Sequence, residues 1–137
     1  MKKDFNLVIK LLCDKGYILP GDLVIVMQTQ LNNWALLFGA VGGAIAGSKV
    51  QPYIVSVNNR GIRLFELDKK TYEYTNGMID LPYSKIIKLR TGTFGGMSLK
   101  IKVEGFSISL QANNKMYGFD QKDSIKKCTE LLKNHKI

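Results

Sequence analysis

The chain has 137 residues, of which 45% are hydrophobic and 23% are charged. This length suits one domain with its own core, so it excludes a multidomain enzyme, and the composition excludes intrinsic disorder. The formal net charge is +9, and one histidine and two cysteines are too few for a structural zinc site with four ligands. We therefore expect no metal and no cofactor.

The positive charge comes almost entirely from lysine, because only Arg60, Arg63 and Arg90 among the 20 basic residues are arginine. Arginine is favoured where phosphate or guanine is recognised by paired hydrogen bonds. A lysine-rich surface instead favours diffuse attraction, and it leaves plain solvation, an anionic membrane and nucleic acid all open. The basic N-terminus resembles a signal peptide, but Lys10 interrupts its apolar run. We therefore expect a cytoplasmic protein with reduced thiols.

The N-terminal part of the chain predicts a helix followed by a strand. Apolar side chains recur every three or four positions over residues 4–15, which indicates an amphipathic helix. A Pro-Gly turn follows, and residues 23–29 form a β-branched apolar run of strand length. We divide the chain into an N-terminal helix and turn over residues 1–19 and a domain over residues 20–137.

Residues 31–48 differ from the rest of the chain because they contain no charged side chain between Trp34 and Gly47. Small residues recur there every fourth position, which on a helix lets another backbone approach closely. The run is shorter than the roughly 20 residues that span a bilayer. Packing within the domain, a subunit interface and a membrane surface all remain open. The predicted interaction stripe consists of Trp34, Ala35, Phe38, Gly39, Gly42, Gly43 and Gly47.

Beyond residue 50 the apolar period changes to two, which indicates strands. We expect strands over residues 53–58, 61–67, 78–82, 85–91, 97–104 and 106–112, and a final helix over 119–135. This order predicts a mainly β fold, a curled antiparallel sheet or barrel of about seven strands, with a glycine-rich helix inserted after the first strand. The C-terminal helix is expected to pack through Ile125, Cys128, Leu131 and Leu132.

Two hairpin registers follow from the alternation. Val57 is expected to face Ile62, and Val103 to face Phe106, with Phe106 on the core side. Alternation also predicts that Ile87 points inward.

The same alternation places four cations on one outer face. Leu89 points inward, so Lys88 and Arg90 point outward; Leu99, Ile101 and Val103 point inward, so Lys100 and Lys102 point outward. Pairing of these strands would bring the four cations together, with Ser107, Ser109 and Gln111 continuing the face. Like charges opposite one another on a sheet are unfavourable, and an anionic partner would relieve them. A solvated face without a ligand is the alternative.

Catalytic residues are not indicated by the sequence. His135 is the lone histidine, and a cation near a helix C-terminus is favourable by itself. We interpret Cys13 and Cys128 as small core residues. The glycine-rich residues 92–96 lack the Lys-Ser/Thr end of a phosphate loop and precede a strand rather than a helix.

Two segments resemble bacterial pleckstrin-homology-like (PH-like) domains. PYIVSVNNRGIRLF is similar to their second hairpin, and IDLPYSKIIKL looks like a recurring strand entry. The resemblance covers about residues 20–135 and implies a seven-strand barrel with one C-terminal helix. It also implies a binding or scaffolding module rather than an enzyme. Members that bind phosphoinositides have a basic pattern in the first hairpin loop, whereas this chain has the apolar glycine-rich segment there.

The sequence therefore predicts a non-catalytic module that acts through a protein partner or a second copy of itself, with peripheral attachment to an anionic membrane as an additional role. The predicted anion-binding residues are Lys88, Arg90, Lys100 and Lys102. The alternative is a single-stranded nucleic-acid binder, because Tyr72, Tyr74 and Tyr83 lie near lysines and aromatic platforms are typical of such proteins. The expected location is cytoplasmic, extending to the inner face of the membrane.

Overall fold

The computed structural model describes residues 5–29, 51–92, 96–116 and 119–135. In chain order the described elements are α1 (Phe5–Asp14), β1 (Leu23–Thr29), β2 (Pro52–Val57), β3 (Gly61–Leu67), β4 (Tyr74–Pro82), the 3-10 helix η1 (Tyr83–Lys85), β5 (Ile86–Gly92), β6 (Gly96–Val103), β7 (Phe106–Asn113), β8 (Lys115–Met116), β9 (Phe119–Asp120) and α4 (Lys122–Lys133).

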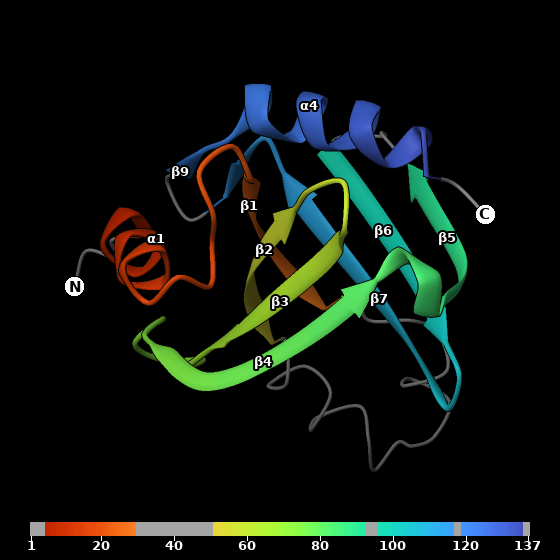
Figure 1. Ribbon diagram of the computed structural model, residues 1–137. Helices are drawn as coiled ribbons and strands as arrows, with labels where there is room; N and C mark the ends of the chain where they lie inside the picture. The colour runs from red at the N-terminus through yellow and green to blue at the C-terminus, as the bar shows by residue number, and fades with distance from the viewer. Residues whose placement is uncertain (1–4, 30–50, 93–95, 117–118, 136–137) are drawn as a thin grey trace, which may run out of the picture.

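Within the described residues, strands β1 to β7 form one antiparallel sheet, in the order β4-β3-β2-β1-β7-β6-β5. The sheet is not closed, because β4 and β5 adjoin through η1 in the chain yet stand at opposite ends of the strand order. Figure 1 shows the sheet curled on itself, with α4 across one end, where it packs against β1, β5 and β6. The prediction of a mainly β fold with N-terminal and C-terminal helices is confirmed.

Both predicted hairpin registers are confirmed. Val57 pairs with Ile62 between β2 and β3, and Val103 pairs with Phe106 between β6 and β7. Phe106 therefore lies on the same face of the sheet as Val103, as predicted, but its side chain is 45% exposed. Phe106 is the first residue of β7, directly after the turn, and the core does not extend that far.

Two predicted boundaries shift. Strand β4 begins at Tyr74, so the expected Asn76-Gly77 turn lies inside a strand; Asn76 adopts a φ of 73°, and the register shifts opposite it in β3. The last helix begins at Lys122 rather than at residue 119, because β9 pairs with β8 immediately before it.

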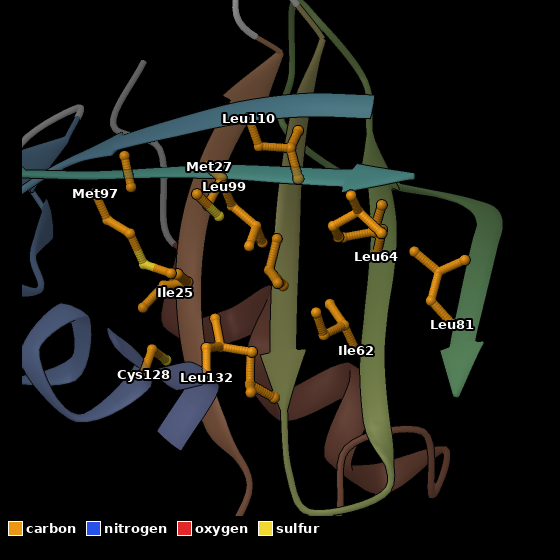
Figure 2. Packing of buried hydrophobic residues seen from close by; sticks show 14 of the residues in the cluster. Ile25, Met27, Ile62, Leu64, Leu81, Met97, Leu99, Leu110, Cys128 and Leu132 are labelled. Atoms are coloured by element: carbon orange, nitrogen blue, oxygen red, sulfur yellow. The ribbon is translucent and has the colours of Figure 1, made fainter. Parts of the chain in front are cut away.

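The main core lies inside the curl of the sheet. Alternate residues of the strands point there, and α4 contributes Ile125, Cys128 and Leu132, all buried. Figure 2 shows Cys128 and Leu132 of α4 on the side of the helix that faces the strands, with Cys128 close to Ile25. Leu131 is partly buried against the same cluster. The predicted apolar stripe of the C-terminal helix is therefore confirmed.

A second hydrophobic cluster covers the outer side of β1, β2 and β3. Phe5 and Leu12 of α1 are buried there against residues that include Ile54 and Phe65. These strands are therefore buried on both faces, and all six residues of β2 are buried. Cys13 is exposed on α1, so its assignment to the core is wrong: the buried stripe of this short helix includes Leu12 but not its neighbour.

Ser56 provides a stability test of this doubly buried sheet. Its side chain is 1% exposed, and its hydroxyl has no hydrogen-bond partner among the described residues. Because a buried unpaired hydroxyl costs free energy, we expect Ser56→Ala to raise the free energy of unfolding by about 1 kcal/mol and the melting temperature by about 3 °C.

Thermal denaturation measures this effect, and Ser84→Ala, at an exposed position of η1, is the matched control. A melting temperature that falls for Ser56→Ala would show that the hydroxyl is stabilised by a partner.

Candidate functional site

The four predicted cations meet on the outer side of β5 and β6. Lys88 pairs directly with Lys102, and Arg90 pairs directly with Lys100. Directly opposed residues of an antiparallel pair have Cβ atoms about 5 Å apart. All four side chains are exposed. The structure thus brings together the whole predicted set, which came from two separate stretches of alternation.

Strand β7 adds a hydroxyl to each of these pairs. Ser107 pairs with Lys102, and Ser109 pairs with Lys100. The result is two parallel rows, each with two cations and one serine, about 7 Å apart along the strands because they are separated by two residues. We call this set the basic face: Lys88, Arg90, Lys100, Lys102, Ser107 and Ser109.

The basic face is slightly hollowed. Its six residues, with Ile101 and Ile108, line an open depression of about 200 Å³. The alternation also placed Gln111 on this side of the sheet. Gln111 pairs with Ser98 and Gln28, and it does not line the depression.

A β-bulge at Ile87 sets the orientation of β5. Ile86 pairs with Val103 and Lys88 with Lys102, so Ile87 is the extra residue of this strand. Ile86 and Leu89 are both buried although they are three positions apart, which a regular strand does not allow. Ile87 is 53% exposed, so the prediction that it points inward is wrong. The bulge restores the alternation at Lys88, and the outward placement of Lys88 and Arg90 is unaffected.

No carboxylate of the described ranges forms a salt bridge with the basic face. The ion pair that the described residues do form lies away from the basic face, between Arg63 of β3 and Asp80 of β4, at 3.2 Å. Two opposed cations in water repel each other by about 1 kcal/mol. This repulsion is small enough for the fold to tolerate, and a bound anion would replace it with attraction.

The predicted interaction stripe, from Trp34 to Gly47, lies outside the described residues.

Cys128, Tyr83 and His135 pack against their neighbours and form no catalytic group with one another. Burial raises the pKa of Cys128 to about 12, so its thiol stays protonated. Burial, with a smaller effect of Cys128, raises the pKa of Tyr83 to about 12, and the Tyr83 hydroxyl donates to the carbonyl oxygen of Asn58 at 2.7 Å. The His135 ring stacks on Tyr83 with centroids 4.0 Å apart. Over the described ranges, no group of three or more His, Cys, Asp or Glu could hold a metal ion.

The tyrosines considered as nucleic-acid platforms are engaged in packing. Tyr72 is 8% exposed and contacts Phe5 edge-on, while Tyr74 packs against Phe65 and Tyr17. With Tyr83 stacked on His135, none of the three lies beside the basic face.

The alternation missed two exposed apolar side chains beside the β6–β7 turn, at the end of the strands that carry the basic face. Ile87 and Phe106 are both large, apolar and exposed, and they flank Val103 on the neighbouring strands. The signal available in the sequence was the Glu104-Gly105 turn, which makes Phe106 the first residue of its strand. Nothing in the sequence indicated the bulge that exposes Ile87.

Neither helix of the described segments combines the length and hydropathy that crossing a membrane requires.

No family model matches the sequence. No curated protein matches it either. Among solved structures, the chain is similar to the hSac2 domain from the human phosphoinositide phosphatase Sac2, with a TM-score of 0.52 and 12% sequence identity over 98% of this chain and 84% of that one. At this identity the likeness concerns the fold alone, and it supports the expected architecture: an open seven-strand antiparallel sheet with a C-terminal helix, consistent with a PH-like fold.

Proposed function

We propose that this chain is a non-catalytic PH-like binding module of the bacterial type, which attaches peripherally to an anionic membrane surface through the basic face. In this role it resides in the cytoplasm, at the inner face of the membrane. The observation behind the proposal is the pairing of Lys88 with Lys102 and of Arg90 with Lys100, with a serine beside each pair.

The charges on this face suit weak and reversible binding. A basic residue close to an anionic leaflet contributes about 1 kcal/mol, so four contribute about 4 kcal/mol, or roughly a thousandfold in affinity. Exposed charges are screened over about 8 Å at physiological ionic strength, so the attraction acts only when the face is close to the headgroups. The hSac2 domain comes from a phosphoinositide phosphatase, which is compatible with a lipid partner. The basic face, however, is the stronger support.

Nucleic acid is the less favoured partner because the depression on the basic face is lined by lysine, arginine, serine and isoleucine, without an aromatic ring for base stacking. Self-association through the stripe from Trp34 to Gly47 stays a prediction, because that segment lies outside the described residues.

Co-sedimentation with vesicles tests the proposal. We expect the wild-type protein to bind phosphatidylserine vesicles, not phosphatidylcholine vesicles, and we expect this binding to weaken as salt rises. Changing Lys88, Arg90, Lys100 and Lys102 to serine should weaken binding about a thousandfold, which is effectively its loss.

The matched control changes four exposed lysines of α4 to serine and lowers the net charge equally; these are Lys122, Lys126, Lys127 and Lys133. Equal weakening by both variants would mean that overall charge, rather than the basic face, causes binding. The nucleic-acid alternative would be favoured if the wild-type protein does not bind anionic vesicles but binds single-stranded oligonucleotides in a gel-shift assay, with a steep dependence on salt.

A further inference from the structure

Two exposed apolar side chains lie beside the β6–β7 turn, at the end of the strands that carry the basic face. Phe106 opens β7 and is 45% exposed, and Ile87 occupies the bulge of β5 and is 53% exposed. Val103 of the intervening strand β6 pairs with Phe106 on one side and with Ile86, the neighbour of Ile87, on the other. We call Ile87 and Phe106 the apolar rim.

The apolar rim is bordered by cations. Lys88 follows Ile87 directly, and Lys102 pairs with Ser107, the residue after Phe106. On the other side of the rim, Lys85 of η1 lines a hollow of about 500 Å³ together with Ile87, Val103 and Glu104. The hollow is completed by Leu81 and Ser84.

We propose that the apolar rim inserts into the interface of an anionic bilayer, so that the protein docks with its β6–β7 turn toward the lipid and its basic face against the headgroups. This inference rests on the proposed function, and it adds an orientation and an apolar component to it. The bilayer is the occupant that matches both features, because interfacial segments combine buried apolar side chains with flanking lysines that reach the headgroup level.

Two physical consequences distinguish this docking from attraction by charge alone. Burial of apolar area is not screened by salt, so part of the binding should survive at high ionic strength. Glu104 lies in the turn beside the rim and is repelled by an anionic surface. Glu104→Gln should therefore tighten binding about fivefold, the effect of one unit charge near such a surface.

The direct test removes the rim. Because roughly half of each side chain remains to be buried, Ile87→Ser with Phe106→Ser should weaken partitioning to phosphatidylserine vesicles about thirtyfold and abolish the part that resists salt. The matched control is Leu19→Ser with Met78→Ser, since these residues are 40% and 43% exposed and lie away from the basic face. The control should bind like the wild type, and unchanged melting temperatures should show that both variants fold.

Depth of insertion gives a second readout. Phe106→Trp should add tryptophan emission to that of Trp34, and brominated lipids should quench this added emission. Met78→Trp should add emission that brominated lipids do not quench. If the wild type does not bind anionic vesicles at all, the proposed function fails and the orientation with it. If the wild type binds but the rim variant binds equally well and the Phe106→Trp emission is unquenched, the orientation is overturned while the proposed function stands.

Discussion

Replacing Leu132 with aspartate is expected to destabilise the domain by about 4 kcal/mol or more, which is a large part of the 5–15 kcal/mol typical of a folded domain. Leu132 is fully buried between α4 and the curled sheet, in the same cluster as Ile125 and Cys128. An aspartate there would bury a charge without a partner. Urea denaturation followed by circular dichroism measures the loss, which should appear as a large fall in the urea midpoint.

Neighbouring positions on α4 provide the controls. Leu131→Asp should cost less, because Leu131 is only partly buried. Lys133→Asp is exposed and should stay within about 1 kcal/mol of the wild type, the small loss reflecting a negative charge at the helix C-terminus. If Leu132→Asp keeps the wild-type midpoint, α4 does not pack on the sheet as described.

The basic face could be predicted from sequence because it depends on alternation and on the pairing of strands that are neighbours in the chain. In each strand a buried leucine or isoleucine separates two cations, so their outward direction follows from a period of two. The short Glu104-Gly105 turn then fixes the register of β6 against β7, which brings Ser107 opposite Lys102. Local rules of this kind do not depend on the rest of the molecule.

The features that sequence reasoning missed depend on tertiary context. The bulge at Ile87 exists because Ile86 and Leu89 are both buried, and the apolar sequence around them fits either phase of the strand. The position of α1 was also missed. Ile54 and Phe65 lie on the outer side of β2 and β3, where polar residues are expected, and they require a cover that α1 supplies.

The side chain of the buried Gln121 makes hydrogen bonds to the backbone of β1 at a position where no strand pairs with it. β7 pairs with β1 only at Gln28 and Thr29, so Val26 has no strand partner on that side. The Gln121 side chain, 2% exposed, takes its place: the Val26 N–H donates to Oε1 at 2.7 Å, and Nε2 donates to the Val26 carbonyl at 2.8 Å. Nε2 also donates to the Asn113 carbonyl at 3.0 Å. The amide thus joins β1, the end of β7 and the start of α4.

Gln121→Leu should therefore cost about 3 kcal/mol or more, because it leaves these backbone groups buried without partners at about 1–3 kcal/mol each. Urea denaturation measures the total, and hydrogen exchange at the Val26 amide localises it, since that proton should lose protection before the rest of β1. Thr129→Val is the control: Thr129 is also buried, but its hydroxyl donates to the Ile125 carbonyl within its own helix. Removing that donor should cost about 1 kcal/mol. Equal losses for the two variants, with Val26 still protected, would contradict a bridging role for Gln121.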